Sequence, residues 1–471
     1  MNTPFDTIAA IATAGGPAAL SIVRMSGPET AAICHQVIAS GRSGPALSLS
    51  PAESHRLFYG RAVDPVNTTV IDEVMVAWMA APRSYTTEDT AEISCHGGGI
   101  AANSVLRAVL AAGARHAEPG EFTFRAFLHG RIDLTEAEAV LNLVSAQTSD
   151  GFRHALEDLH GDLGRRIAPA KAAVISALAY LDASADFPDD EIPASNVSAD
   201  IATAIAALEE VLAGAKSGRL MAEGATIALV GRPNVGKSSL LNALLRSDRA
   251  IVTPVAGTTR DIVSEKAVIA DIPVLLMDTA GLTDSLDLVE QAGIERSRTA
   301  LGRASLVIVV LEGSAPLNAD DRTVLDVVRQ RFDLGAAGPT PVIVVANKLD
   351  LGLSFSSHSV LVALGLDVPF IPISAHTGEG LEELEQVIGH VLREGVDASA
   401  RPSILTARQY AELDRALLHI RQAAQALTDG YPTDLLATDV RIAGRAIGNV
   451  TGESIDDAVL AEIFGRFCIG K

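Results

Sequence analysis

The sequence predicts a multidomain α/β protein: an α+β N-terminal domain, a discontinuous all-α helical domain, and an inserted domain with a doubly wound, mostly parallel sheet. Three observations favour this class. The chain has 471 residues, and at roughly 150 residues per domain that length suggests about three domains. Residues 224–380 alternate strand-like and helical runs, the pattern of a parallel sheet covered by helices. The flanking residues, 134–218 and 381–471, have helical apolar spacing almost throughout.

Residues 1–120 mix strand-like and helical runs, so we expect an α+β domain there. Apolar runs at 74–81 and 91–95 predict strands. Apolar residues at helical spacing over 28–39 and 100–112 predict helices, because each of these runs ends at or next to Ser or Gly.

An Ala/Leu-rich helical stretch begins near Leu134, where Thr135 is a candidate N-cap before acidic first-turn residues. The pattern continues to about residue 186 and resumes after the proline-containing segment 187–193. The most economical interpretation is one α/β domain inserted into a helical domain that closes around it. The predicted boundaries are residues 1–120, 121–222 (first helical part), 223–383 (inserted domain) and 384–471 (second helical part). The predicted strands of the inserted domain are 227–230, 274–277, 306–311, 342–345 and 370–373.

Composition excludes a disordered chain, because 48% of the residues are hydrophobic and only 20% are charged. The formal net charge is −21, and each of the four predicted segments is negative. Since phosphate neutralisation needs clustered Lys and Arg, a nucleic-acid partner would have to use a local patch or a second protein.

The three cysteines, Cys34, Cys95 and Cys468, are odd in number and far apart, so no disulfide framework or paired metal-ligand spacing is expected. The N-terminus lacks the basic leader of a signal peptide. No apolar run is long enough to cross a bilayer. We therefore expect a cytoplasmic protein with no membrane partner.

Residues 231–238 read G-R-P-N-V-G-K-S and match the phosphate-loop pattern G-x-x-x-x-G-K-S, between a strand-like and a helical run. The glycines let backbone N–H groups turn inward, and the helix N-terminus adds a favourable dipole. Lys237 is expected to meet the β- and γ-phosphates, and the Ser238 hydroxyl to bind Mg²⁺.

Four further motifs follow in chain order, each fitting a nucleotide contact. Thr259 fits a switch threonine that completes Mg²⁺ coordination, and the Asp278–Gly281 motif, D-T-A-G, fits contacts to hydrated Mg²⁺ and the γ-phosphate. Asp350, in N-K-L-D, has a carboxylate that can accept both the N1–H and the exocyclic amine of guanine, a donor pair that adenine lacks. The backbone at Ser374 and Ala375 fits guanine O6. Because ligands of doubly wound sheets bind at strand carboxyl ends, the motifs jointly predict a GTP-binding domain.

Leu282 stands where Ras-like enzymes have the glutamine that orients the attacking water, so catalysis must be organised otherwise. Asn234 could supply an oxygen to a monovalent cation placed where an arginine finger would lie. Glu290 could hold a bridging water, although an acidic residue in such a stretch is more often part of a solvated helix face.

With these motifs, the chain resembles the MnmE (TrmE) family of tRNA-modification GTPases over its whole length. The flanking motifs are more specific than the nucleotide motifs. They are I-V-R-M-S-G (22–27), E-D (88–89) with Glu92, H-G-G (96–98), P-G-E-F (119–122), R-A-F-L (125–128), D-L (133–134), E-A-E-A (136–139), F-P-D-D-E-I (187–192) and F-C-I-G-K (467–471).

The resemblance implies a folate-binding N-terminal domain that mediates homodimerisation, and a G domain that dimerises in a K⁺-dependent way. It implies a heterotetramer-type complex with the flavoprotein MnmG (GidA), which carries FAD. Together they install an aminomethyl or carboxymethylaminomethyl group at C5 of the wobble uridine of certain tRNAs. The one-carbon unit comes from 5,10-methylenetetrahydrofolate, with 5-formyltetrahydrofolate as an analogue.

The resemblance also implies roles by position. Glu290 falls at the family's water-positioning glutamate, which reverses the earlier preference for a solvated residue. Cys468 lies in the terminal motif and is a candidate catalytic residue, whether as nucleophile, thiolate stabiliser or structural plug. Arg131 stands where lysine is usual, so the charge is kept but not the shape. The implied K⁺ ligands are Asn234, Thr253, Val255 and Thr258; the Mg²⁺ ligands are Ser238 and Thr259; the folate contacts are Arg24, Glu92, Arg131 and Lys471. The implied GTP contacts are Asn234, Val235, Gly236, Lys237, Ser238, Ser239, Thr253, Pro254, Val255, Ala256, Gly257, Thr258, Thr259, Asp278, Thr279, Ala280, Gly281, Asn347, Lys348, Asp350, Ser374, Ala375 and His376.

The predicted function is thus a K⁺-activated GTPase that hydrolyses GTP to GDP and phosphate and acts in tRNA wobble-uridine modification. Two alternatives differ in class. One is a GTP-dependent binding switch in ribosome or RNA assembly without modification chemistry, which would need no folate pocket. The other is a stand-alone one-carbon transferase with GTP as regulator. Because every segment is acidic, most of the tRNA affinity is expected to lie in the partner.

Overall fold

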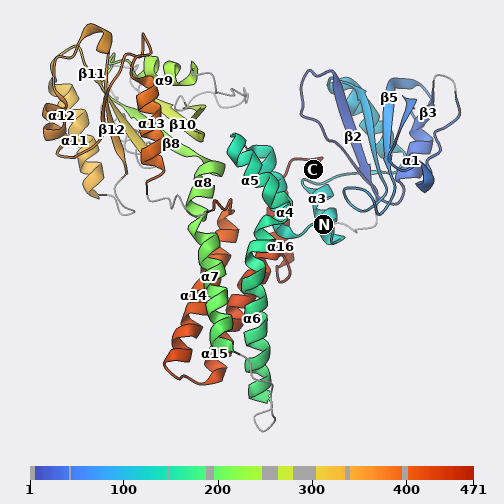
Figure 1. The fold of residues 1–471 in the computed structure, drawn as a ribbon. Coiled ribbons are helices and arrows are strands. Elements are labelled where there is room, and N and C mark those ends of the chain that lie inside the picture. Colours follow the sequence, from blue (N-terminus) through green and yellow to red (C-terminus); the bar gives the residue numbers. More distant parts are fainter. Residues whose placement is uncertain are drawn as a thin grey trace. The chain divides into compact units, whose positions relative to one another are not determined.

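The computed structural model describes residues 6–41, 44–146, 148–186, 196–246, 264–278, 304–334, 340–394 and 401–470. These residues form two compact units (Figure 1). The first comprises Met1–Leu141, Asp158–Ala204 and Arg415–Lys471, and the second comprises Asn142–Glu157 and Ile205–Asp414. No helix within the described ranges is long and apolar enough to span a membrane.

The first unit contains a sheet whose seven described strands have the order β3-β4-β5-β6-β2-β1-β7. Neighbouring strands are antiparallel except for β1 and β7, which are parallel. Helices α1 (Thr30–Val37) and α2 (Gly99–Ala111) pack on one face of the sheet. The strands are β1 (Ile8–Ile11), β2 (Leu20–Ser26), β3 (Ile38–Ser40), β4 (Arg56–Val63), β5 (Val70–Met79), β6 (Thr90–His96) and β7 (Arg115–His116).

Side chains alternate between the two faces of this sheet, as they must in extended strands. Val23 and Met25 of β2 and Ile93 of β6 face the helices and are buried with Trp78 in one core. The intervening residues face the other side, where two cross-strand rows run over four strands. One row is Leu57, Ala77, Glu92 and Arg24, and the other is Tyr59, Met75, Ser94 and Ile22.

The helical part of the first unit draws on both ends of the chain. Helix α6 (Asp162–Asp186) packs along α15 (Thr433–Thr451) (Figure 1). Helix α3 (Glu121–Leu128) meets α16 (Asp457–Gly465) through aromatic rings, with Phe124 and Phe464 in edge-to-face contact at 5.1 Å. Leu134 and Ala137 of α4 (Leu134–Ser145) share a core with Leu460 and Phe464. The predicted discontinuous helical domain is therefore present.

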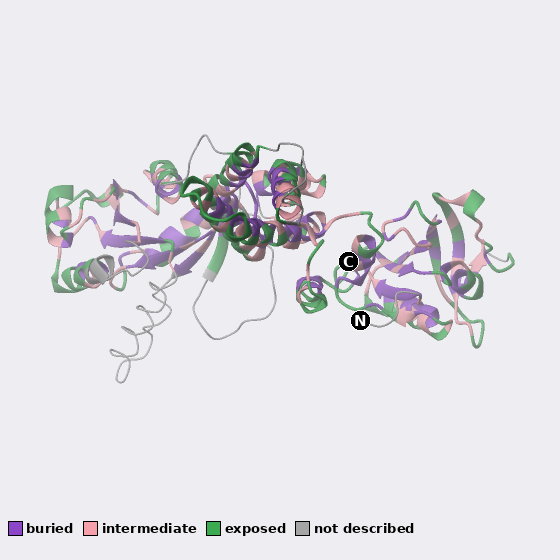
Figure 2. Cartoon of the chain, turned by 90° about the horizontal axis from the view of Figure 1, so that it is seen from below, coloured by how far each residue is buried: buried purple, intermediate pink, exposed green. Residues whose placement is uncertain are grey.

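The second unit contains a sheet whose six described strands have the order β13-β12-β11-β8-β10-β9. All neighbouring pairs are parallel except β10 and β9. The central strands are buried along almost their whole length (Figure 2), as expected where helices cover both faces. The strands are β8 (Ala225–Val230), β9 (Ser264–Ile269), β10 (Ile272–Asp278), β11 (Leu306–Glu312), β12 (Val342–Asn347) and β13 (Phe370–Pro372).

Helices pack on both faces of the second sheet (Figure 1). Leu240 of α9 (Lys237–Arg246) and Leu384 of α13 (Leu381–Leu392) are buried in the core on one face. Leu325 of α11 (Ala319–Leu334) and Val360 of α12 (Ser357–Leu364) are buried on the other. This confirms the predicted doubly wound fold. The remaining helices in the described ranges are η1 (Pro51–Glu53), α5 (Ser149–Leu159), α7 (Val197–Ala213), α8 (Ala215–Glu223), η3 (Leu349–Leu351) and α14 (Ala407–Thr428).

The five strands predicted for the inserted domain all correspond to observed strands, with ends that differ by at most two residues. The expected strands at 74–81 and 91–95 correspond to β5 and β6. The expected helix at 28–39 is shorter, because the chain turns into β3 at Ile38. Strand β9 was not predicted, since its charged residues suit a solvent-facing edge strand as well as a loop. The four-part division by residue number stays a prediction.

Candidate functional site

The predicted phosphate loop connects β8 to α9. Its Lys237 side chain is buried and its Nζ donates hydrogen bonds to the carbonyl oxygens of Gly231 (2.7 Å) and Arg232 (2.9 Å). Asn234 and Gly236 have left-handed backbone conformations, with φ of 63° and 95°. A Cβ added at Gly236 would lie 2.2 Å from Nδ2 of Asn347, so only glycine fits at this point.

Asn347, the last residue of β12, joins three of the predicted loops. Its Nδ2 donates to the carbonyl oxygen of Val235 in the phosphate loop at 2.9 Å. Its Oδ1 accepts from the backbone N–H of Ala375 at 3.0 Å. Because Asn347 is only 2% exposed, these bonds are shielded from water and hold the loops in register.

The carboxylate predicted to recognise guanine, that of Asp350, is also held by a hydrogen bond from a buried side chain. The Ser374 hydroxyl donates to Oδ1 of Asp350 at 2.6 Å and accepts from the Thr377 N–H at 3.1 Å. Ser374 is fully buried whereas Asp350 is exposed, so the serine fixes a carboxylate that a ligand can reach. A pocket of about 530 Å³ opens beside these residues, lined by Ser239, Asn242 and Ala243 of α9, by Ala375, His376, Thr377 and Gly378, and by Leu381 and Glu385 of α13.

These loops occupy the place where doubly wound sheets bind ligands. β8, β12 and β13 are parallel, so the loops after them leave from the same edge of the sheet. β8 lies between β11 and β10, at the point where the strand order changes direction. The structure thus brings together Asn234–Ser239, Asn347–Asp350 and 374–376, although the first of these lies more than a hundred residues before the other two in the sequence.

Other predicted contacts lie outside the described residues. Asp278 is the last residue of β10, at the same edge of the sheet as the phosphate loop. The predicted residues outside the described part are Thr253, Pro254, Val255, Ala256, Gly257, Thr258, Thr259, Thr279, Ala280, Gly281, Glu290 and Lys471. The roles given to them stay predictions.

The described donors fit the predicted cations as partial sites. Ser238 lies in the first turn of α9 and offers a hydroxyl oxygen, and Asn234 offers an amide oxygen. Both are the oxygen donors that Mg²⁺ and alkali ions prefer. No group of three or more His, Cys, Asp or Glu side chains in the described ranges is arranged to hold a metal.

Two of the predicted folate contacts, Arg24 and Glu92, lie in the first unit on the sheet face opposite α2. Arg24 donates from Nε to Oε1 of Glu92 at 2.8 Å. It also donates from Nη1 to the carbonyl oxygen of Gly470 at 3.1 Å, which brings the C-terminal motif against β2. The Arg24 guanidinium carbon lies 5.6 Å from the centre of the Phe122 ring, so α3 supports it from one side.

Arg131 joins the same arrangement through an aromatic cluster. Its guanidinium lies 5.4 Å from the centre of the Tyr85 ring and donates to the carbonyl oxygen of Ser84. Tyr85 packs against a small core that contains Phe122, the ring beneath Arg24. Arg24, Glu92 and Arg131 thus border one cluster.

Cys468 is the one exposed thiol of the three cysteines. Cys34 and Cys95 are buried, and burial raises the pKa of the Cys34 thiol to about 12. Since the thiolate is the reactive form, Cys34 is chemically inert and any thiol chemistry is left to Cys468.

Sequence reasoning missed a buried ionic network beside the predicted folate contacts. Arg125 of α3 is 2% exposed, and its Nη2 donates to Asp6 (2.6 Å) and Glu121 (2.9 Å) while its Nη1 donates to Glu88 (3.1 Å). Hydrogen bonding from Arg115 holds the pKa of Asp6 below its ordinary value. Burial works to raise the pKa of Glu121, but hydrogen bonds led by that from Arg115 outweigh it and lower the value. Glu88, Glu121 and Arg125 were noticed only as parts of motifs.

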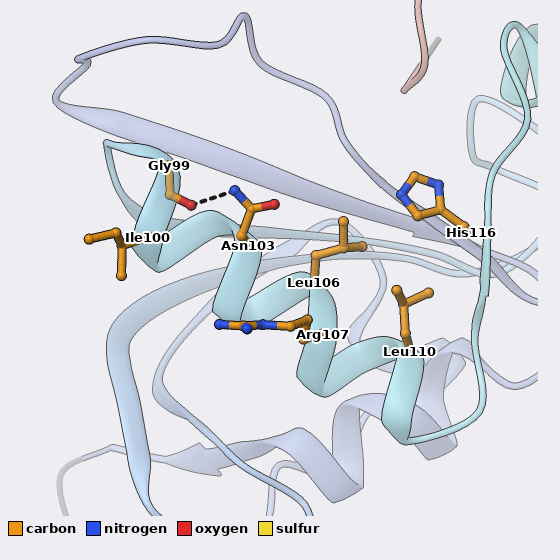
Figure 3. A pocket seen from close by; sticks show the side chains of 7 residues that line it. All are labelled: Gly99, Ile100, Asn103, Leu106, Arg107, Leu110 and His116. Atoms are coloured by element: carbon orange, nitrogen blue, oxygen red, sulfur yellow. Dashed lines mark hydrogen bonds between the residues drawn. The ribbon is translucent and has the colours of Figure 1, made fainter.

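A second pocket, of about 630 Å³, lies on α2 (Figure 3). It is lined by Gly99, Ile100, Asn103, Leu106, Arg107, Leu110 and His116. Because α2 packs on the sheet face opposite Arg24, this pocket is separated from the predicted folate contacts by the sheet. None of the predicted site residues lines it.

Comparisons with known proteins cover almost the whole chain. The family model "MnmE helical domain" matches residues 134–468, and "GTP-binding protein TrmE N-terminus" matches residues 7–131. The chain is 43% identical over 470 residues to the tRNA modification GTPase MnmE of Chloroflexus aurantiacus, covering 99% of this chain and 100% of that one. It is 40% identical over 476 residues to the protein of that name from Lactiplantibacillus plantarum, covering 100% and 99%. Among solved structures, the G domain of the T. maritima FeoB iron transporter is 28% identical, with a TM-score of 0.27, covering 36% of this chain and 98% of that one.

Proposed function

Because the chain belongs to the MnmE family of tRNA modification GTPases, we propose that its hydrolysis of GTP is K⁺-activated and drives tRNA wobble-uridine modification. The partner is the flavoprotein MnmG (GidA), and the product carries an aminomethyl or carboxymethylaminomethyl group at C5. The one-carbon unit comes from 5,10-methylenetetrahydrofolate. The observation that carries the proposal is the meeting of Arg24, Glu92 and the C-terminal motif in a chain that also has guanine-nucleotide loops.

The nucleotide loops explain binding and charge stabilisation. In the structure the ammonium of Lys237 is held by two loop carbonyls, at the position from which it would meet the β- and γ-phosphates. Asp350 accepts the guanine edge, held by Ser374. Asn234 would supply an oxygen for K⁺ together with Thr253, Val255 and Thr258, and a cation there would offset charge that develops on the phosphates. Glu290 positions the attacking water, in place of the glutamine that Leu282 replaces.

The Arg24–Glu92 pair supplies both donors and an acceptor, which suits the amide and amine edge of a reduced pterin. Arg131, and Lys471 beside Gly470, add positive charge that suits the carboxylates of a folate tail. Cys468 is two residues from the carbonyl that Arg24 binds, so its exposed thiol is near the proposed folate position.

The face of the first sheet opposite α1 and α2 supports the proposal of a homodimer. Leu57, Tyr59 and Met75 are exposed on it, and Leu57 is 67% exposed. Leu57 lies in the same cross-strand row as Arg24 and Glu92, and Tyr59 and Met75 lie in the other row on that face. A contiguous apolar face of this kind usually marks an interface, and a second copy placed there would enclose the folate contacts.

The proposal is tested by mass-spectrometric analysis of tRNA nucleosides from a deletion strain that carries variant genes. We expect the deletion to lose the C5 modification and the wild-type gene to restore it. Lys237→Ala and Arg24→Gln should both fail to restore it, but only Lys237→Ala should lose GTP hydrolysis in the purified protein. Unchanged modification in the deletion strain would favour the binding switch, and modification by the purified chain without the flavoprotein would favour the stand-alone transferase.

Arg24→Gln should weaken binding of 5-formyltetrahydrofolate by about tenfold or more, because a charged hydrogen bond contributes about 1.5–3 kcal/mol. Isothermal titration calorimetry of the full-length protein measures this. Arg107→Gln, an exposed arginine of α2 on the other face of the sheet, is the matched control and should bind normally. Equal affinity of the Arg24 variant and the wild type would remove Arg24 from the folate site.

GTP turnover should be about tenfold or more faster in KCl than in NaCl at equal ionic strength, because a cation near the phosphates acts as an electrostatic catalyst. Phosphate release under saturating GTP measures it. Asn234→Ala should remove the difference between the two salts. Equal rates of the wild type in both salts would contradict K⁺ activation.

A further inference from the structure

One carboxylate links the phosphate loop to the guanine motif. Glu312 is the last residue of β11, the strand that lies between β8 and β12 in the sheet. The loop after β8 is the phosphate loop, and the residues after β12 form the guanine motif. Glu312 is paired in register with Asn347, so its side chain stands at the edge where both loops begin.

Glu312 uses its two oxygens on two different loops. Oε2 accepts from Nη2 of Arg232, the second residue of the phosphate loop, at 2.5 Å. Oε1 accepts from Nζ of Lys348 in the guanine motif at 2.7 Å. The hydrogen bond from Lys348, followed by that from Arg232, holds the pKa of Glu312 below its ordinary value against the opposing effect of burial. Glu312 is therefore ionised at neutral pH and bridges the two cations.

Arg232 is held on a second side as well. Its Nε donates to Oδ1 of Asp321 at 3.1 Å, and Asp321 is only 3% exposed at the start of α11. Oδ2 of Asp321 accepts from the backbone N–H of Asn318 at 3.2 Å. Because these partners are partly or fully buried, the pairs are screened less than surface ion pairs.

Arg232 and Lys348, the two residues that Glu312 binds, hold the backbone that is predicted to contact the nucleotide. The carbonyl oxygen of Arg232 is one of the two that hold Lys237. Lys348 has a left-handed backbone conformation, with φ of 68°, two residues before Asp350. A conformation of this kind in a non-glycine residue persists only where its surroundings hold it.

We propose that Glu312 is a positioning residue that couples the phosphate loop to the guanine motif and holds both in the nucleotide-binding geometry before GTP arrives. It touches neither the reacting atoms nor the base. Glu312 therefore lowers the free energy needed to order the two loops. That free energy affects the affinity for nucleotide and not the rate of the chemical step.

Glu312→Gln keeps the size of the side chain and removes its charge. We expect the Kd for GTP and GDP, and the KM for GTP, to rise about tenfold with kcat changed less than about twofold, because bound nucleotide itself restores the loop geometry. Glu312→Asp keeps the charge and should regain most of the lost affinity. Asp320→Asn, an exposed carboxylate next to Asp321, is the matched control and should leave the Kd unchanged.

A double-mutant cycle tests the coupling directly. Arg232→Gln and Lys348→Gln are combined, and the Kd for a fluorescent GDP analogue is measured by stopped-flow in the full-length protein. With Glu312 present, the increase in Kd of the double variant should differ by a factor of several from the product of the two single increases. In the Glu312→Gln background, the increase in Kd of the double variant should equal that product. The cycle in the wild-type background can be measured even if Glu312→Gln is too unstable to study. Thermal melts of each variant show whether it is folded. Independent effects in the wild-type background would overturn the proposal, as would a Kd of a folded Glu312→Gln variant within about twofold of the wild type.

Discussion

Asp350→Asn should exchange guanine for xanthine as the preferred base. The Asp350 carboxylate can accept both the N1–H and the exocyclic amine of guanine, and it is exposed while its partner Ser374 is buried. Asparagine offers one acceptor and one donor, so its amide repels the guanine amine and instead pairs with the C2 carbonyl of xanthine. Losing charged hydrogen bonds to guanine should raise the Kd for GTP by about 10²–10⁴-fold.

Competition binding with GTP, XTP and ATP measures this exchange. The preference for XTP over GTP should rise by a comparable factor, and ATP should stay weak in both proteins. Asp367→Asn, an exposed aspartate in the same unit, is the control and should keep the preference for GTP. If GTP and XTP both bound weakly to the Asp350 variant, Asp350 would be a support of the Ser374 loop and not a base contact.

The nucleotide site could be predicted from the sequence because each of its contacts is encoded over a few consecutive residues. A strand-like run followed by Asn347-Lys348-Leu349-Asp350 predicts both the position of the guanine contact and the group that makes it, since carboxyl ends of parallel strands meet at one edge of the sheet. The contacts that join these loops could not be predicted in the same way. Nothing local to Glu312 indicates that Arg232 and Lys348 converge on it, because that depends on the order of the strands.

The predicted folate region shows the same limit more strongly. Arg24 and Gly470 are 446 residues apart in the chain, and only the packing of both chain ends in one unit brings them into contact. The buried state of Arg125 was also beyond local reasoning, since arginine is rarely buried without partners and two of its three carboxylates, Asp6 and Glu88, come from distant segments. Strand β9 was missed because edge strands need no continuous apolar run.

Arg125→Ala should destabilise the first unit by about 3–5 kcal/mol, because it leaves buried carboxylates without their cation. Arg115 remains to pair with Asp6 and Glu121, but Glu88 loses its guanidinium partner and keeps the hydrogen bond from the Ser26 hydroxyl at 2.6 Å. Arg125→Lys should recover part of the loss, since an ammonium restores the charge but not the forked geometry.

The effect should depend on pH with a definite sign. Folding lowers the pKa values of Asp6 and Glu121, so their pairing stabilises the fold above the unfolded value of about 4 and is lost as pH falls through the lower folded values. The difference between wild type and Arg125→Ala should therefore be largest at neutral pH and should shrink below about pH 4. The protein has one tryptophan, Trp78, buried in the first sheet, so its fluorescence in urea reports on this unit alone. Arg107→Ala, an exposed arginine of the same unit, should cost less than about 1 kcal/mol. A cost for Arg125→Ala as small as that of the control, or one independent of pH, would mean that the network does not hold α3 against the sheet.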